Sequence, residues 1–401
     1  MKVGILTYHF VSNFGANLQT LSTFGYFQNS GHEPIIINWI PDDLEKYYEK
    51  IVPNEQNEAF HQFAAERFTK ISKICRNSLD IANVVEREGI ELVVIGSDAV
   101  LTYIPIISRF HFTRWGLKYC KPCVDSDFPN AFWGDFVKYL NRPVKLAVMS
   151  GSAQNTNYPK ILFKKSQFKD AIDRFSYISV RDVWTQNMVH KLSKGTVIPS
   201  ITPDPVFAFN QNVKDQFSKA YILDKFGLDE NFVLVTVDHK AVTPNWKKQV
   251  ETEFEKHGIT AYELPQANKP AKNVLEHQLR FPIDPMEWYC LIKYSMGYVG
   301  ELMHPVLCAL HNSIPLYVVD TYGFKKKGES YGINPLSSKT YQIINRFGFM
   351  DNYSNVNLPE TVASPSDVVT RVLSFDRDKC AKEASKMFDE YNEMMKEIIT
   401  E

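Results

Sequence analysis

Ionisable side chains directly follow several predicted strands, at the edge where a parallel α/β sheet collects its functional groups. The clearest cases are Arg181, His304 and the run Asp238-His239-Lys240. An arginine fork binds two oxygens of a phosphate or carboxylate at once, and a histidine beside a carboxylate can transfer protons. Structural explanations are open as well. Arg181 could pair with Asp182 or another surface carboxylate, and a solvated charged loop is the simpler explanation of His239.

His304 stands directly before Pro305, a residue well suited to the first helical position. We therefore expect His304 to be the N-cap of a short helix. The positive end of the helix dipole disfavours the cationic imidazole and favours an anion nearby. A histidine at such a corner either faces a cleft as a catalytic group or is a packing residue.

Small polar residues follow three further predicted strands. Asn13 and Gly15 suit a tight turn with positive φ at Gly15, and backbone N–H groups in such a turn can cradle an anion. Ser97 and Asp98 are best explained as caps of a following helix, with ligand contact as the alternative. Ser150 lies in a turn that lets the backbone come close to a ligand.

The composition indicates a well-packed globular protein, because 44% of the 401 residues are hydrophobic and 13% are aromatic. The formal charge of −1 gives no reason to expect nucleic acid or an anionic membrane as partner. Cys120 and Cys123 form one CxxC without a second pair, so no metal site is predicted. The apolar run at the N-terminus is too short for a signal peptide. No apolar stretch approaches the roughly 18 residues that a membrane-spanning helix requires. We therefore expect a cytoplasmic protein with no transmembrane segment.

Short apolar runs alternate with amphipathic segments, the pattern of an α/β fold with parallel sheets. The predicted strands are Val3–Leu6, Pro34–Asn38, Leu92–Ile95, Lys145–Met149, Tyr177–Val180, Phe232–Val237, Ala261–Leu264, Tyr298–Gly300 and Leu316–Val319. The predicted helices include Asn17–Asn29, Phe60–Arg76, Phe163–Phe175 and Val183–Leu192, the last with Asp182 placed to cap it. The proline-rich segment Ile198–Asn210 is the predicted linker, so we expect two Rossmann-like domains, 1–205 and 206–378, that face a cleft. A C-terminal helix, 379–401, is long enough to pack back on the first domain.

Several of these motifs occur together and in order, over roughly Val3 to Phe349, in one known family. The chain resembles the polysaccharide pyruvyl transferases. The matching motifs are Asn13-Phe14-Gly15-Ala16-Asn17-Leu18-Gln19, Gly96-Ser97-Asp98, Ser179-Val180-Arg181-Asp182, the corner Glu301-Leu302-Met303-His304, and Ser337-Ser338-Lys339 where the family often has S-S-R.

The resemblance implies a GT-B-like arrangement and transfer of a pyruvyl group from phosphoenolpyruvate to a sugar, free or as part of a lipid-linked glycan. It implies that Arg181 and His304 hold the phosphate and carboxylate of the donor, with His304 also a candidate for proton transfer. The expected substrate-binding residues are Asn13, Gly15, Gln19, Ser97, Asp98, Ser150, His239 and Lys339. The implied chemistry requires no metal or cofactor.

Two other functions stay open on the sequence. A glycosyltransferase of the same GT-B architecture would use a nucleotide-sugar donor, and a non-catalytic member would bind partners in polysaccharide assembly. Donor binding separates the three, because a bound donor raises the melting temperature by mass action.

Overall fold

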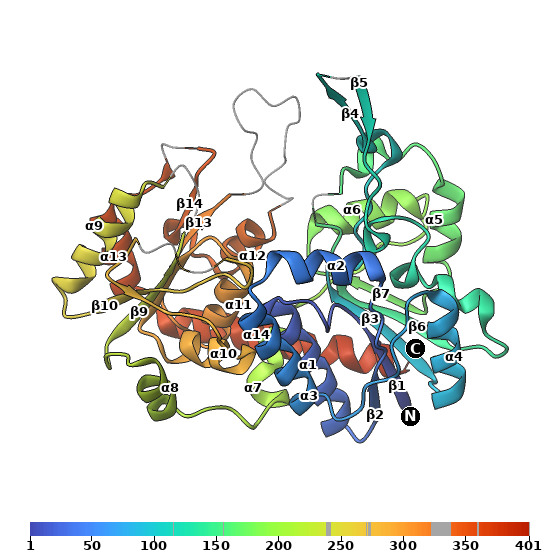
Figure 1. Cartoon of the computed structure of the whole chain (residues 1–401), viewed down its shortest axis with the longest axis horizontal. Helices are drawn as coiled ribbons and strands as arrows, with labels where there is room; N and C mark the ends of the chain where they lie inside the picture. Colours follow the sequence, from blue (N-terminus) through green and yellow to red (C-terminus); the bar gives the residue numbers. More distant parts are fainter. Residues whose placement is uncertain are drawn as a thin grey trace.

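The computed structural model of the chain describes residues 1–400 except 115, 155, 238–241, 270, 272–273, 322–337 and 359–360. Within these residues, two parallel six-stranded sheets lie side by side, each covered by helices (Figure 1). A small antiparallel hairpin projects from the first of them. This topology confirms the expected α/β fold with two Rossmann-like domains. The domain boundaries at 205 and 378 stay a prediction.

The first sheet has the strand order β2-β1-β3-β6-β7-β8. Its strands are β1 (Lys2–Leu6), β2 (Glu33–Ile36), β3 (Leu92–Asp98), β6 (Lys145–Gly151), β7 (Tyr177–Val180) and β8 (Ser200–Ile201). The hairpin strands are β4 (Phe110–Thr113) and β5 (Gly116–Tyr119). The central strand β3 is buried along almost its whole length, as expected for a parallel sheet covered on both faces.

The second sheet has the order β11-β10-β9-β12-β13-β14. Its strands are β9 (Phe232–Thr236), β10 (Thr260–Glu263), β11 (His277–Gln278), β12 (Gly297–Gly300), β13 (Leu316–Asp320) and β14 (Tyr353–Asn355). In each sheet the order reverses beside its first strand, between β1 and β3 and between β9 and β12. Ligands of open α/β sheets bind outside the carboxyl ends of the strands at such switch points. The fold therefore places Asp98, the last residue of β3, and His304, after β12, at the two expected ligand edges.

The helices pack on the faces of both sheets. They are α1 (Phe14–Asn29), α2 (Asp42–Ile51), α3 (Asn54–Arg67), α4 (Ser78–Glu88), α5 (Lys165–Ile172), α6 (Val183–Leu192), α7 (Phe209–Asn212), α8 (Lys219–Phe226), α9 (Pro244–Glu255), α10 (Pro285–Tyr294), α11 (Met303–His311), α12 (Lys339–Phe347), α13 (Pro365–Leu373) and α14 (Arg377–Thr400). Several of these helices are capped by a side chain at their start. Asp182 accepts a hydrogen bond from the backbone N–H of Thr185 at 2.7 Å, which confirms its predicted cap of α6.

The extent of one predicted helix is wrong. The helix predicted at Phe60–Arg76 ends at Arg67, because the following residues form isolated bridges beside β2 at Ile71 and next to Trp39 at Cys75. The predicted linker carries the exposed strand β8 and a buried turn of 3₁₀-helix, Pro205–Ala208. Its role as the domain boundary stays a prediction.

His304 is not an N-cap, contrary to the sequence prediction. Helix α11 begins two residues earlier than predicted, and its N-cap is Leu302, which makes no side-chain capping bond. Pro305 is tolerated in the first turn because the N–H groups there have no intrahelical acceptor in any case. His304 therefore lies within the first helical turn.

A continuous hydrophobic core joins the two domains. The ring of Phe14, at the start of α1, stacks on Trp288 of α10 with centroids 5.0 Å apart. Helix α14 crosses between the domains, where Tyr391 contacts Tyr26 edge to face and Met394 accepts hydrogen bonds from the hydroxyls of Ser150 and Ser179. These contacts fix where the second domain's side chains meet the first domain.

Gly15 of the first domain contacts His304 of the second. It lies in the first turn of α1, which begins three residues before the predicted Asn17, and it has no positive φ, so the predicted turn conformation is wrong. Its requirement for glycine is steric instead. A Cβ at Gly15 would lie 1.9 Å from Cγ and 2.1 Å from Nδ1 of the His304 ring. The imidazole therefore rests directly on the glycine backbone.

Gly15→Ala should destabilise the protein by about 1–3 kcal/mol, because the methyl group overpacks against His304. A compatible glycine-to-alanine change in a helix has the opposite sign, a gain of about 0.4–1 kcal/mol. Urea unfolding measures the difference. As the matched control, the double variant Gly15→Ala/His304→Ala removes the ring and should recover stability relative to Gly15→Ala. A stabilised Gly15→Ala variant would contradict the contact.

Candidate active site between the two sheets

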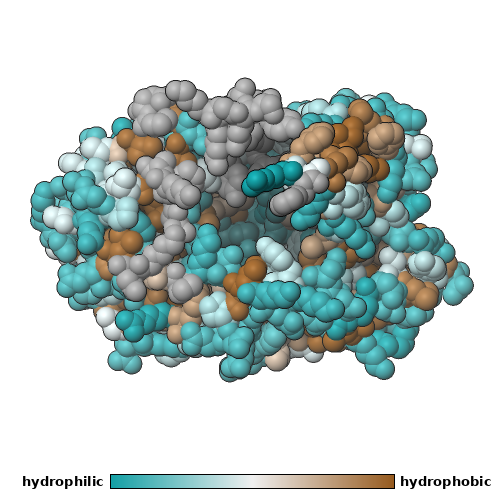
Figure 2. Space-filling model, turned by 45° about the horizontal axis from the view of Figure 1, so that its top comes forward, coloured by the Kyte–Doolittle hydropathy of each residue, from teal (hydrophilic) through white to brown (hydrophobic). Residues whose placement is uncertain are grey.

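A cavity of about 520 Å³ lies between the carboxyl ends of the two sheets. Figure 2 shows the surface hollowed between the domains. The charged or ionisable side chains of its lining include, from the first domain, Asp98, Asp125 and Arg181, and, from the second, Glu301, His304 and Lys339. Both domains thus contribute charge to one cleft, which is the usual setting of a small-molecule site.

Arg181, directly after β7, makes a buried double ion pair. Its Nη1 lies 2.6 Å from Asp204 Oδ2 and its Nη2 lies 3.0 Å from Asp98 Oδ1, and its side chain is only 3% exposed. Burial lowers the pKa of Arg181, but the two carboxylates outweigh it and the net shift is upward. Burial raises the pKa of Asp98, yet Arg181 and then His304 and Lys339 bring it below its usual value. Both partners therefore stay ionised at neutral pH.

The side chains of Gln19 and Ser97 form a hydrogen-bond chain beside this ion pair. Gln19 of α1 donates from Nε2 to Asp204 Oδ2 at 2.5 Å and approaches Ser97 Oγ at 3.4 Å. Ser97 in turn donates to the backbone oxygen of Ser150 at 3.1 Å. No helix follows β3 directly, so the prediction that Ser97 and Asp98 cap one is wrong. Asp98 instead adopts a left-handed φ of 84° and pairs with Arg181.

His304 enters the cavity from the opposite side. Its Nε2 is buried and has no hydrogen-bond partner among the described residues. Burial lowers the pKa of His304, and the nearby Asp98 opposes this only in part, so the imidazole is neutral at pH 7 in the empty cavity. A buried polar atom without a partner costs free energy, which a bound ligand can recover.

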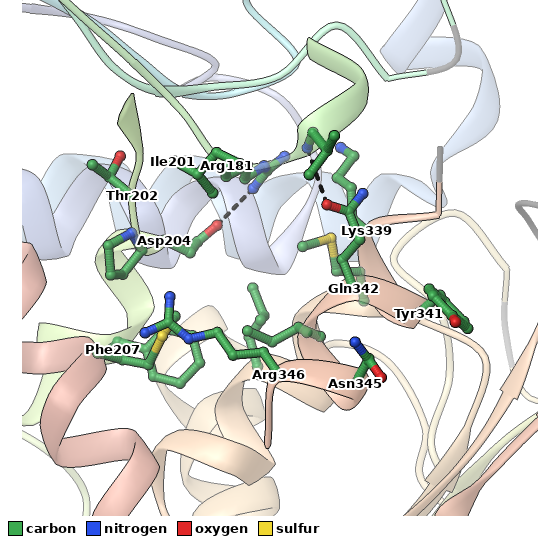
Figure 3. A pocket seen from close by; sticks show the side chains of 16 residues that line it. Arg181, Ile201, Thr202, Asp204, Phe207, Lys339, Tyr341, Gln342, Asn345 and Arg346 are labelled. Carbon is green, nitrogen blue, oxygen red and sulfur yellow. Dashed lines mark hydrogen bonds and ion pairs between the residues drawn. The ribbon is translucent and has the colours of Figure 1, made fainter. Parts of the chain in front are cut away.

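Lys339 is the first residue of α12 and the second cation of the site. Burial, and then the charge of Arg181, lowers the pKa of Lys339 to about 8. Figure 3 shows its side chain extending from α12 toward Arg181. Both cations also line a smaller pocket of about 290 Å³ on their other side, where Arg346 is neutralised by Glu383 and Glu390. Among the described residues, Lys339 makes no hydrogen bond or ion pair of its own.

Part of the cavity wall is aromatic and acidic. Tyr8 donates a hydrogen bond to Asp125 Oδ2 at 2.7 Å, and Tyr47 and Tyr48 line the same wall. Burial raises the pKa of Asp125, which makes this carboxylate a stronger base than an exposed one. Rings with hydroxyl ends and a basic carboxylate suit a polyhydroxylated ligand.

The remaining predicted residues divide between lining and support. Asn13 lines the cavity and caps α1 by accepting from Ala16 N at 3.3 Å, and Gly15 borders an adjoining hollow. Gln19, Ser97 and Ser150 are buried behind the lining and support it. Ser150 donates to Pro203 O at 2.6 Å.

The prediction for His239 lies outside the described residues. The sequence reasoning missed Asp204 and Asp125, which lie at the start of one short 3₁₀-helix and within another, away from the strand ends. The prolines that flank Asp204 and the aromatic residues around Asp125 were the only signals available.

Among the described residues, no group of three or more His, Cys, Asp or Glu side chains is arranged to hold a metal ion. None of the described helices combines the length and apolar character needed to cross a membrane.

Solved structures give distant likenesses only. UDP-GlcNAc 2-epimerase from Neisseria meningitidis bound to UDP-GlcNAc has 10% identity and a TM-score of 0.46 over 99% of this chain and 100% of that one. UDP-GlcNAc 2-epimerase from Methanocaldococcus jannaschii has 11% identity and a TM-score of 0.46 over 97% of this chain and 93% of that one. Glycosyltransferase SnogD from Streptomyces nogalater has 10% identity and a TM-score of 0.44 over 98% of this chain and 95% of that one. At TM-scores below 0.5, these likenesses carry no inference about what the chain binds.

Comparison of sequences is more informative. No curated protein matches the chain. A family model, however, described as polysaccharide pyruvyl transferase, matches residues 13–321. That span begins at the cap of α1 and ends just after β13, so it includes Arg181, Asp204 and His304. Because the match covers well over half of the sequence, the chain belongs to the polysaccharide pyruvyl transferase family.

Proposed function

We propose that the protein transfers the pyruvyl group of phosphoenolpyruvate to two hydroxyls of a sugar, forming a ketal in a surface polysaccharide or its precursor. The observation that carries this proposal is the convergence of Lys339 and His304 from one domain on Arg181 from the other, at the carboxyl ends of both sheets. Family membership favours the pyruvyl donor. The ammonium group of Lys339 and the unpartnered imidazole nitrogen of His304 favour an anionic group beside them.

The donor is best placed at the basic end of the cavity. Lys339 offers an ammonium group with no ion pair among the described residues, while two nitrogens of Arg181 already bind carboxylates. Phosphate and carboxylate groups are therefore expected to contact Lys339, His304 Nε2 and the remaining Nε–H of Arg181, which has no partner among the described residues. The negative donor would raise the pKa of His304, because a nearby anion favours the imidazolium.

A protonated His304 is then suited to act as the general acid. Addition of one sugar hydroxyl across the double bond places a proton on the vinyl carbon and the sugar oxygen on the adjacent carbon. Attack by a second hydroxyl closes the ketal, and inorganic phosphate leaves. In the first step the imidazolium gives its proton to the vinyl carbon and takes up the one that the first hydroxyl loses, so the step is proton-neutral. In the second step the proton of the second hydroxyl leaves with inorganic phosphate.

The acceptor is best placed at the aromatic end. The rings of Tyr8, Tyr47 and Tyr48 offer apolar faces to a sugar ring, and Asp125 can accept a hydroxyl proton because burial raises its pKa. The two ends share one cavity, so the reacting atoms can meet without movement of either domain.

His304→Gln should lower the rate of phosphate release from phosphoenolpyruvate by about 10²–10⁴-fold, because the amide cannot transfer a proton at neutral pH. The assay uses a panel of soluble glycosides with paired free hydroxyls, and the melting temperature should change little. The matched control is His61→Gln, on the exposed surface of α3. Full activity of His304→Gln would refute the assigned role.

Arg181→Ala is a poorer test of catalysis. It would leave Asp98 and Asp204 as unpaired buried carboxylates, at a cost of about 3–5 kcal/mol of stability. Donor identity is tested separately by thermal unfolding. Phosphoenolpyruvate should raise the melting temperature and UDP-N-acetylglucosamine should not. The reverse result would favour a nucleotide-sugar transferase, and no shift with either would favour a non-catalytic member.

Affinity for phosphoenolpyruvate should fall as the pH rises through about 8, because Lys339 then loses its proton. The donor phosphate is already fully ionised in this range, since its second pKa is about 6. Burial keeps the pKa of His304 below its usual value, so His304 in the free enzyme does not titrate there. Titration calorimetry between pH 7 and 9.5 measures the slope.

Lys339→Arg should lose the fall in affinity around pH 8, because a guanidinium stays protonated, and should keep only the slope that comes from proton uptake by His304 on donor binding. Lys339→Met should bind weakly at every pH. Lys248→Met, on the exposed face of α9, is the control and should retain the slope of the unmodified protein. Undiminished pH dependence in Lys339→Arg would show that another group titrates.

A further inference from the structure

The hairpin of β4 and β5 has one apolar face that nothing in the described chain covers. Its register pairs Phe110 with Tyr119 and Phe112 with Leu117. Residues directly opposite in an antiparallel pair share a face, so these four side chains form one surface. Phe112 is 91% exposed and Leu117 is 57% exposed. The rings of Phe110 and Tyr119 contact each other, with their centroids 5.2 Å apart.

Such exposure of large apolar side chains is unusual for a protein surface in contact with water. All residues of both strands are exposed, and the hairpin projects from the body of the molecule (Figure 1). The exposed Ile104 and Ile107 extend the apolar surface toward its base. Figure 2 shows hydrophobic surface at this end of the molecule, beside the central hollow. A contiguous apolar patch of this kind marks an interaction site.

The charges around the hairpin indicate what the partner is. Residues 99–124 contain no Asp or Glu and four Lys or Arg. Arg109 is neutralised at the base by Asp127 at 2.6 Å, whereas Lys118 and Lys121 are exposed. Lys118 lies opposite His111 on the face away from the rings. Aromatic side chains on one face and lysines around them suit the headgroup region of an anionic bilayer, where rings insert and ammonium groups meet phosphates.

The base of the hairpin connects this surface to the cavity. The cavity wall includes Thr102 and Ile104 from the segment before β4. It also includes Cys123 and Asp125 from the segment after β5. We propose that the β4–β5 hairpin docks the protein on an anionic membrane surface, inserting Phe112 and Leu117, and so brings the cavity to an acceptor carried on a lipid. The lipid-carried acceptor rests on the proposed function, whereas membrane docking does not.

The test is co-sedimentation of the full chain with vesicles of phosphatidylglycerol and phosphatidylcholine, compared with phosphatidylcholine alone. The protein should bind the anionic vesicles, and added salt should weaken binding because it screens the lysines. Phe112→Ser/Leu117→Ser should lower the bound fraction at least about ten-fold, and Lys118→Glu/Lys121→Glu should remove the preference for the anionic lipid.

The matched control is Leu373→Ser, an exposed leucine of α13, which should bind as the unmodified protein does. Thermal unfolding verifies that the hairpin variants stay folded, and phosphate release with soluble glycosides should be unchanged in them. Absence of binding to anionic vesicles would overturn the proposal, as would equal binding by Phe112→Ser/Leu117→Ser. A concentration-dependent dimer that this variant abolishes would also overturn it, because the apolar face would then contact a second copy.

Discussion

The site depends on one buried interaction, the double ion pair of Arg181 with Asp98 and Asp204. It joins the ends of two strands to the segment that leads toward the second domain, and Gln19 adds the first helix. Charges buried in this way cost several kcal/mol each unless they are paired and hydrogen-bonded. The pair therefore fixes the carboxyl edge of the first sheet, and it sets the electrostatic potential that His304 and Lys339 meet from the second.

The second domain contributes its groups through close packing. The imidazole of His304 rests on the backbone of Gly15, and the stacked rings of Phe14 and Trp288 lie beside this contact. Because protein interiors are close-packed, a helix position that must accept another ring leaves room only for hydrogen. The packing explains why a glycine stands at the start of α1, where its helix propensity is poor.

Much of the fold was predictable from local patterns. Apolar runs such as Leu92–Ile95 and Tyr177–Val180 marked the strands, and Asp182 marked a helix start. The site was predictable to the extent that strand ends carry function, which identified Arg181, and His304 was recognised through its motif. The partners of Arg181 were not, because the pairing of Asp204 with a residue 23 positions away is a tertiary contact without a local signal. Net charge likewise concealed the basic, apolar hairpin, since the total of −1 averages over the whole chain.

The most direct test of the site is a crystal structure with phosphoenolpyruvate soaked into it. The predicted result is a single donor in the cavity between the sheets, with its phosphate or carboxylate within hydrogen-bond distance of both His304 Nε2 and Lys339 Nζ. A donor bound by the first domain alone, or one located away from the carboxyl ends of the strands, would contradict a site shared by the two domains.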